Sequence, residues 1–302
     1  MAQKKNQSNK TERPSAYQVI NDLIVQRLEQ GDIPWMQRYT PEQKALGPAR
    51  NERTGTVYKG VNKLLLPPGR YSTYKGAKES GGQVRKGEKA HKIFKPITAL
   101  RRDKDKDVLD PVTGAVITEG TRRIVVDYTY DSVFHESQID WNEPLPAPKE
   151  EVYDGDPIED AETLILEYRF REGVSIQDGA GEPGYVKETD TILIPLRSRY
   201  RSAEAYYLDL FHEMVHSTGA EHRLRRRLPA MAAKGHAASM EELTAEIGAA
   251  YLMDSLGMCS ADTIDDTAAY CRQWIDLLRS DENALTRASS AADKAVAFIL
   301  GN

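Results

Sequence analysis

The sequence predicts an α+β protein of two domains joined by a linker, and three features of its 302 residues support this. The first half of the chain is basic and rich in Gly, Lys and Tyr, whereas the second half is acidic. Four prolines and a dense acidic run fill residues 141–160 between them. The second half carries mainly the apolar spacing of helices, with at least one strand. We therefore expect a small α+β domain at 14–140, a linker at 141–160 and a helix-rich domain at 161–302.

The charge difference between the halves is large. Residues 1–106 hold 23 Lys and Arg against 10 Asp and Glu, a difference of +13. Residues 141–302 hold 16 against 29, a difference of −13. Two units with different partners are the simplest interpretation, and the basic one suits a polyanion.

The first domain should begin with a helix. Ser15 and Gln18 form a capping-box pattern, and Gly31 and Pro34 end the helical stretch. The residues that share one face of this helix are Tyr17, Ile20, Leu23, Ile24 and Leu28. Further along, Ile124, Val126, Tyr128 and Tyr130 alternate with polar residues, which predicts a half-buried strand over 122–130.

The second domain should contain five helices and a strand. Helices are expected over 161–171, from Ser202 towards Gly219, over 240–256 before Gly257, and over 264–279 and 283–300. Residues 191–196 form the predicted strand. We expect this strand at the edge of its sheet, where an extended peptide could pair with it.

The helix that follows Ser202 carries the run His212-Glu213-Met214-Val215-His216. Residues four apart lie on one face of a helix, so His212 and His216 can bind one metal ion together. Glu213 is then placed to act as the general base of a metal-dependent hydrolysis. This pattern predicts a zinc metallopeptidase site, with Zn²⁺ or another divalent transition metal as the cofactor.

A third protein ligand is needed, and two candidates compete. His222 completes an H-E-x-x-H-x-x-G-x-x-H spacing through Gly219, which is the metzincin pattern. Glu242 lies on the next predicted helix and is followed four residues later by Glu246, which could orient a histidine ligand from outside the metal's own shell. We favour Glu242, the gluzincin-like solution, while its neighbour Glu241 is a third alternative.

The basic half interleaves cations with aromatic rings. Single-stranded nucleic acid is bound in this way, with cations on the backbone and rings stacked on the bases. The alternative is a solvated basic face with tyrosines in the core. The residues that we predict to contact DNA are Lys59, Arg70, Tyr71, Tyr74, Lys75, Arg85, Lys86, Lys89 and Lys92.

Both halves resemble one known family. The segments TDTILIPLRSRYRSAEAYYLDLFHEMVHSTGAEHRLRR and SMEELTAEIGAAYL resemble the zincin-like domain of ArdC-type antirestriction proteins. PARNERTGTVYKGVNKLLL, GGQVRKGEKAHKIFKP and VFHESQID resemble that family's single-stranded-DNA-binding domain. The resemblance covers roughly residues 15–300 in the same order. It departs from the family at Arg70–Tyr74, where a Trp is usual, and at His135, where an Asn is usual.

The resemblance implies that His212, His216 and Glu242 bind the metal and that Glu213 is catalytic. It implies binding to single-stranded DNA and protection of incoming DNA from restriction, on plasmids or other mobile elements. Three functions stay open: a DNA-guided protease acting on restriction enzymes or other DNA-bound proteins, a protein that protects by occupying DNA while its metal site is structural, and a fragment related to plasmid primases.

The sequence also suggests where the protein acts and how its halves cooperate. No segment approaches the roughly 20 apolar residues of a membrane span, and the first residues lack a signal peptide's apolar region. A cytoplasmic protein without a membrane partner is expected. Because a linker rich in prolines and acids is extended and can keep the two domains apart, we expect them to fold and act separately, without a large shared core.

Overall fold

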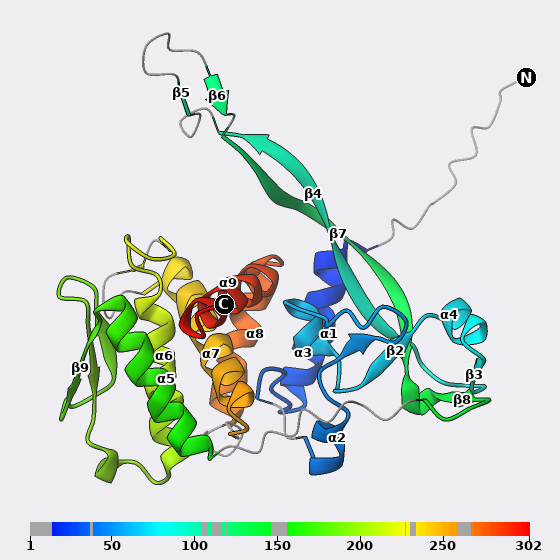
Figure 1. Ribbon diagram of the computed structural model, residues 1–302, viewed down its shortest axis with the longest axis horizontal. Coiled ribbons are helices and arrows are strands. Elements are labelled where there is room, and N and C mark those ends of the chain that lie inside the picture. The colour runs from blue at the N-terminus through cyan, green and yellow to red at the C-terminus, as the bar shows by residue number, and fades with distance from the viewer. Residues whose placement is uncertain are drawn as a thin grey trace, which may run out of the picture.

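The mixture of helices and strands confirms the α+β prediction (Figure 1). The helices of the second half lie together on one side of the molecule, and the strands of the first half lie on the other. A long β-hairpin projects away from both. The computed structural model describes residues 14–36, 39–103, 108–109, 116–118, 120–145, 156–226, 228–229, 234–258 and 267–302. The centre of the predicted linker, residues 146–155, lies outside this part of the chain.

Helix α1 (Ala16–Glu29) begins at the predicted cap, where the Ser15 side chain accepts a hydrogen bond from the Gln18 backbone N–H at 3.1 Å. Its apolar face is buried through Ile20, Ile24 and Leu28. Three short helices follow: α2 (Pro41–Ala45), α3 (Val61–Leu65) and α4 (Tyr74–Glu79).

The main sheet of the first half has the strand order β1-β2-β7-β4. Its strands are β1 (Arg50–Asn51), β2 (Arg70–Ser72), β4 (His91–Arg102) and β7 (Thr121–His135). The predicted strand 122–130 lies within β7, which pairs with β4 along the whole hairpin. A two-stranded sheet joins β3 (Gly82–Val84) to β8 (Ile139–Trp141), with a 3₁₀ turn, η2 (Glu136–Gln138), before β8. Two further short strands, β5 (Val108–Leu109) and β6 (Val116–Thr118), pair beyond the hairpin.

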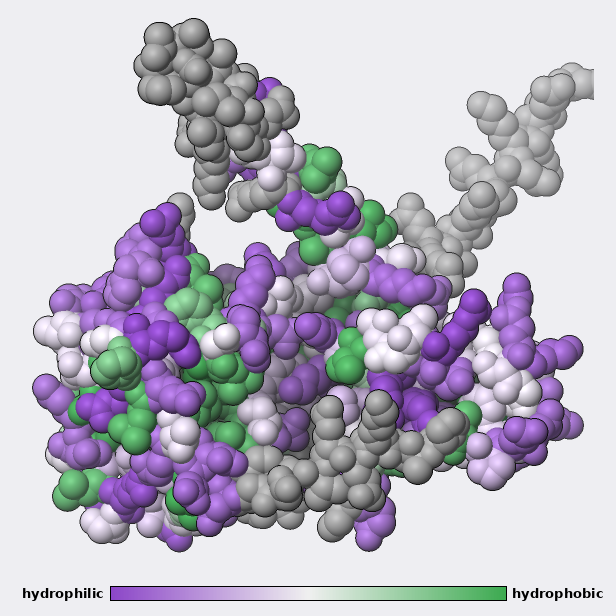
Figure 2. All heavy atoms as spheres, in the orientation of Figure 1, coloured by the Kyte–Doolittle hydropathy of each residue, from purple (hydrophilic) through white to green (hydrophobic). Residues whose placement is uncertain are grey.

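Among the described residues, no second sheet packs over the projecting part of the hairpin to cover its apolar residues. Ile97, Leu100, Val125 and Val126 are exposed there, and Leu100 keeps 70% of its surface. Figure 2 shows these hydrophobic patches in green between hydrophilic residues in purple. A hairpin of this kind is a two-stranded ribbon that depends on the sheet at its base for stability.

The second half begins with α5 (Pro157–Glu172) and a small sheet in the order β10-β11-β9. The strands are β9 (Ser175–Asp178), β10 (Gly184–Val186) and β11 (Thr191–Ile194). The predicted strand 191–196 is therefore real but central, because β9 pairs with it on one side and β10 on the other. Our expectation that it is an edge strand was wrong. The antiparallel edge is β10 instead.

The helices of the second half follow the prediction closely. After the 3₁₀ turn η3 (Arg197–Arg199), they are α6 (Ala203–Ser217), α7 (His236–Ser255), α8 (Thr267–Ser280) and α9 (Ala284–Ile299). Ser202 caps α6 through the Ala205 N–H at 3.2 Å. Helix α7 begins four residues before the predicted start at Met240. The predicted first residues of α8, 264–266, lie outside the described residues.

The two halves share a hydrophobic core, which contradicts the expectation that they lack a large common core. One cluster of buried residues combines Ile20, Ile24 and Trp35 with Leu243 and Trp274. Polar contacts accompany it: the Asn21 amide donates to the Leu278 carbonyl at 2.8 Å, and the Gly60 N–H donates to Asp293 at 2.6 Å. The reason is that α1 buries its apolar face largely against α8 of the second half. Across the described ranges, no helix is long and apolar enough to cross a membrane.

Candidate metal centre

Close packing of α7 against α6 builds the candidate site. Gly248 of α7 lies directly against Val215 of α6, where an added Cβ atom would come within 2.7 Å of Val215 Cγ2. Only glycine allows the helices to approach this closely. This approach brings α7 beside the face of α6 that carries His212 and His216.

Three side chains converge at this contact. His212 Nε2 and His216 Nε2 lie 3.1 Å apart. The Glu242 carboxylate reaches across from α7, with Oε2 at 3.3 Å from His212 Nε2 and Oε1 at 3.6 Å from His216 Nε2. One ligand atom from each of the three residues lies within 4.8 Å of the others, which suits the coordination of a single ion.

The electrostatics of the cluster favour a cation. Burial disfavours the charged form of His216, but the carboxylates of Glu241 and Glu242 outweigh it and raise its pKa to about 10. The pKa of His212 is raised as well, because Glu242 outweighs the effect of burial. Hydrogen bonds from both imidazoles hold the pKa of Glu242 well below its usual range. The carboxylates therefore stabilise positive charge at this site. A divalent metal would supply that charge while the imidazoles stay neutral.

Each imidazole also faces a second carboxylate with its other nitrogen. His216 Nδ1 lies 3.2 Å from Glu241 Oε1, and His212 Nδ1 lies 3.8 Å from Glu246 Oε1. Glu241 is itself held by the Arg226 guanidinium at 2.7 and 3.0 Å. Glu241 is close enough to accept a hydrogen bond from His216 Nδ1, which favours the tautomer that leaves Nε2 free as a ligand, and the charge of Glu246 favours the same arrangement at His212.

Glu213 lies next to the two histidines and is 7% exposed. Burial raises the pKa of its carboxyl, against the opposing effect of His212 and His216. A carboxylate with a raised pKa beside a metal site matches the requirements of a general base.

His222, the competing ligand, lies elsewhere. Its Nε2 atom is 3.4 Å from Asp190 Oδ2, and its side chain is 59% exposed. Among the described residues, the metal-ligand grouping joins Glu242 rather than His222 to the two histidines. Glu241 reaches only the outer nitrogen of His216, so the geometry favours Glu242 over both alternatives.

Sequence reasoning missed the role of Glu241 and its partner Arg226. The adjacent acids Glu241 and Glu242 differ by about 100° around the helix axis. Which of them faces the histidines depends on how α7 crosses α6, and this is a tertiary feature. Arg226 lies in a run of similar basic residues, and nothing in the sequence indicated that this arginine, rather than its neighbours, would bind Glu241.

The predicted DNA-contacting residues separate into two groups. Lys59, Lys75, Lys86 and Lys89 are exposed, and Tyr74 keeps 55% of its surface. Tyr74 lies beside Phe134, with ring centroids 6.4 Å apart. Lys75, Lys86, Lys89 and Tyr74 lie on α4 and on the turn after β3, and this group can present cations and a ring to a nucleic acid.

Each member of the second group makes a polar contact with another residue of the same half. Tyr71 is fully buried and donates its hydroxyl hydrogen to the Pro67 carbonyl, so it cannot stack on a base, and its predicted role is wrong. Arg70 is paired with Glu136 at 2.9 Å, and Arg85 with Glu88 at 2.9 Å. Lys92 donates to Ser132 at 2.8 Å. Lys92 thereby links β4 to β7, and Arg70 links β2 to η2, whereas Arg85 is exposed and pairs within its own turn.

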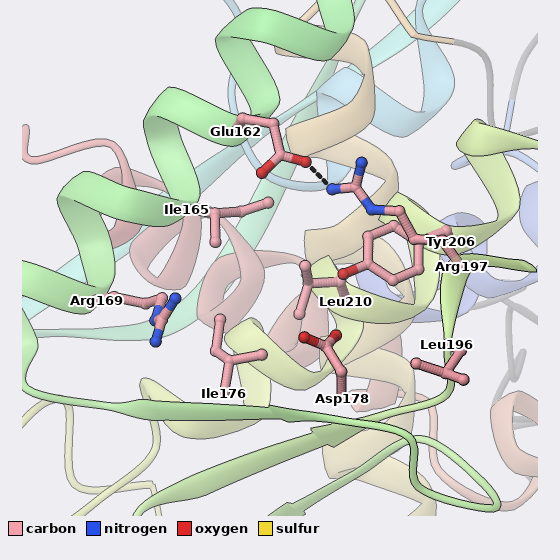
Figure 3. Close-up of a pocket in the computed structure, with 9 residues that line it drawn as sticks. All are labelled: Glu162, Ile165, Arg169, Ile176, Asp178, Leu196, Arg197, Tyr206 and Leu210. Carbon is pink, nitrogen blue, oxygen red and sulfur yellow. Dashed lines mark ion pairs between the residues drawn. The ribbon is translucent and has the colours of Figure 1, made fainter.

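A separate cavity of about 360 Å³ lies between α5, β9 and the first half of α6 (Figure 3). Arg169 and Asp178 border it from opposite sides, and an ion pair joins Glu162 to Arg197 at its rim. Tyr206 and Leu210 of α6 line it, whereas the two histidines of that helix do not. The cavity is therefore distinct from the metal-ligand cluster.

The fold and the site define a class: an α+β protein whose second half is a zincin-like metallopeptidase domain. A family model described as a zincin-like metallopeptidase matches residues 160–291. A second model, the N-terminal domain of anti-restriction factor ArdC, matches residues 14–134. The chain therefore has the two-domain composition of ArdC-type antirestriction proteins, as the sequence resemblance predicted.

Solved structures agree with this assignment. The crystal structure of the antirestriction ArdC protein from plasmid R388, in its metal-free form, is 29% identical and superposes with a TM-score of 0.64. The Mn(II)-bound form of that protein is 26% identical and superposes with a TM-score of 0.65. Each comparison covers 95% of this chain and 98% of the other.

Curated relatives carry other names. Two proteins named DNA primase TraC, from Escherichia coli, are 31% identical over 299 and 300 residues. This chain spans only 20% and 27% of their length. An uncharacterized protein, y4eC, of Sinorhizobium fredii (strain NBRC 101917 / NGR234) is 29% identical over 287 residues, which is 89% of its length.

Proposed function

We propose that this protein binds single-stranded DNA through its first half and hydrolyses peptide bonds at a divalent-metal site in its second half, protecting incoming DNA from restriction. The observation that carries the proposal is the convergence of His212, His216 and Glu242 beside a buried Glu213. The matches to ArdC structures over nearly the whole chain support it. Restriction of incoming DNA takes place in the cytoplasm, so the proposed role places the protein there.

His212, His216 and Glu242 would hold the metal, which we propose to be Zn²⁺ or another divalent transition ion. A bound metal supplies Lewis acidity to the substrate carbonyl and to a water molecule. Glu213 would take a proton from that water and return it to the leaving amine. Glu241 and Glu246 would keep each Nε2 directed inward throughout.

The metal assignment can be tested by metal content. Wild-type protein should hold about one divalent ion per chain. His212→Ala, His216→Ala and Glu242→Ala should each remove it, whereas Glu213→Ala should retain the ion and lose any peptidase activity. His222→Ala is the matched control and should keep both the bound ion and any peptidase activity. An ion lost from His222→Ala but kept by Glu242→Ala would support the metzincin alternative instead.

The nucleic-acid surface can be tested by charge reversal. Lys86→Glu with Lys89→Glu should weaken binding to single strands. It should also reduce the slope of log affinity against log salt by about 0.7 for each phosphate that the protein no longer neutralises. Lys187→Glu with Lys294→Glu, two exposed lysines of the second half, applies the same charge change elsewhere and should leave the slope unchanged. Equal effects of the two pairs would mean that overall charge, not a surface, governs binding.

Protection by occupancy is a second candidate, because part of the surface around Tyr74 is open to DNA whether or not the metal site is active. Transfer of unmodified DNA into a restricting host separates the two. We expect the Lys86→Glu and Lys89→Glu pair to abolish protection and Glu213→Ala to retain much of it. Complete loss of protection in folded, DNA-binding Glu213→Ala protein would instead make proteolysis the protective activity, directed at restriction enzymes or other DNA-bound proteins.

The resemblance to DNA primase TraC favours a DNA-directed role for the segment that this chain shares with it. We propose that the shared segment supplies DNA binding and metal chemistry, and that it does not synthesise primers. Addition of template and ribonucleotides to the purified chain should therefore yield no primer, and primer synthesis would assign the chain to the primase class.

A further inference from the structure

A chain of polar contacts connects the first half of the protein to the metal-ligand cluster. The Trp35 indole Nε1–H donates to the Tyr270 hydroxyl at 3.0 Å. The Tyr270 hydroxyl donates to Glu246 Oε2 at 2.8 Å. The other oxygen of Glu246, Oε1, faces His212 Nδ1 at 3.8 Å. Three side chains thus lead from the residues after α1 to an outer nitrogen of the cluster.

Packing fixes the members of this chain in place. Trp35 is 5% exposed and lies in the core that the two halves share. The Trp274 ring contacts both Trp35 and Tyr270 edge-on, with ring centroids 6.4 and 5.9 Å away. Aromatic side chains held in this way have little freedom to move their polar atoms.

The direction of each hydrogen bond follows from what the groups can donate. An indole N–H is a donor only, and a tyrosine hydroxyl has a single hydrogen. Because Trp35 occupies the oxygen of Tyr270 as a donor, the tyrosine hydrogen is free to point at Glu246. A carboxylate fixed by this hydrogen bond can face His212 Nδ1 steadily and favour the tautomer with a free Nε2.

We propose that Tyr270 and Trp35 are positioning residues for His212 and act on it through Glu246. This inference rests on the proposed function of His212 as a metal ligand. It means that the first half of the protein contributes to the metal centre, although its residues lie outside the family match that defines the zincin-like domain.

The test is the affinity of the metal-stripped full chain for Co²⁺, followed by titration and by the visible spectrum, which reports the ligand arrangement. Tyr270→Phe removes one hydroxyl group and should weaken affinity by up to about 10-fold, because removal of the ligand's own outer partner, here Glu246, costs about 10-fold or more. Trp35→Phe should weaken it in the same direction by a smaller factor. Because Trp35 acts through the hydroxyl, adding Trp35→Phe to Tyr270→Phe should cause no further decrease in affinity.

Tyr251→Phe is the matched control. Tyr251 is buried in the same core, lies on α7 with Glu246, and its hydroxyl has no hydrogen-bond partner among the described residues. Removal of this hydroxyl should change neither affinity nor spectrum. Glu246→Gln keeps an acceptor for Tyr270 and removes the charge that faces His212, so it should weaken affinity even if Tyr270→Phe folds poorly.

The outcomes separate this inference from the proposed function. Failure of wild-type protein to bind Co²⁺ would overturn the metal centre itself. Tight binding by wild type together with equal affinities for Tyr270→Phe and Tyr251→Phe would overturn the positioning chain and leave the metal centre standing. Fully additive effects of Trp35→Phe and Tyr270→Phe would show that Trp35 acts by packing, which also overturns the chain.

Discussion

Single residues in the second half divide between the metal cluster and a buried charge network beside it. Arg223 has no exposed side-chain surface, and both its terminal nitrogens donate to Asp190 at 2.7 Å. His222 adds a third contact to the same carboxylate. His222, which the sequence spacing suggested as a third metal ligand, thus belongs to this network instead. Spacing alone could not separate the alternatives, because the position of His222 depends on the turns that follow α6.

This network leads to a prediction for stability. Asp190→Asn should lower the free energy of unfolding at pH 7 by about 2 kcal/mol, because buried Arg223 loses its charged hydrogen-bond partner but keeps Glu172 at 3.5 Å. Asparagine tolerates the left-handed backbone of this position, whose φ is 48°. Urea unfolding would measure the decrease. Asp178→Asn, at an exposed position on β9, is the control and should change stability by less than about 0.5 kcal/mol.

The same substitution has a pH signature. Burial acts to raise the pKa of Asp190, but Arg223 and Tyr185 outweigh it and lower the pKa from its ordinary value of 3.8. A lowered pKa in the folded state means that the stabilisation is complete above pH 3.8 and is lost as the pH falls below it. The difference between wild type and Asp190→Asn should therefore be constant above this pH and shrink below it. A difference that grew in acid would contradict the ion pair.

Among the elements, those with a strong local pattern were predictable from the sequence. Helices α1 and α6 and strand β7 follow their apolar periodicity, and two serine caps mark the helix starts. The strands β9 and β10 were missed because four and three residues carry too little periodicity. Without them, β11 appeared to be an edge. His212, Glu213 and His216 could be grouped because they share one helix, whereas Glu242 depended on the crossing of two helices.

That crossing leads to a prediction at the scale of elements. Gly248→Ala would place a Cβ atom 2.7 Å from Val215 and push α7 away from α6. We expect stability to fall by about 1–3 kcal/mol. Metal affinity should fall as well, because Glu242 moves with α7. Gly181→Ala, where an added Cβ meets nothing within 4 Å, is the control. Unchanged metal affinity in destabilised Gly248→Ala protein would show that the helix spacing does not set the site.

At the scale of the whole molecule, the charge division along the sequence does not correspond to two independent bodies. The basic half provides an exposed cationic surface near Tyr74, yet its first helix completes the core of the acidic half. Composition could reveal different partners for the halves, but it could not reveal that α1 packs against α8. The linker's prolines and acids suggested two domains held apart by an extended linker. The two halves instead pack directly against each other.

The shared core leads to a prediction about the halves. A protease site inserted between residues 145 and 156 should, after cleavage, leave two pieces that stay together in gel filtration and unfold in one urea transition. They should remain associated because separating them would expose Ile20, Ile24 and Trp274, which are almost fully buried. Ile24→Asp places a charge in this core and should release the pieces after cleavage. Gln26→Asp introduces the same charge at an exposed position of α1, and its cleaved pieces should stay together. Pieces of the wild-type chain that separate on cleavage, each with its own cooperative unfolding, would show that the halves are independent domains.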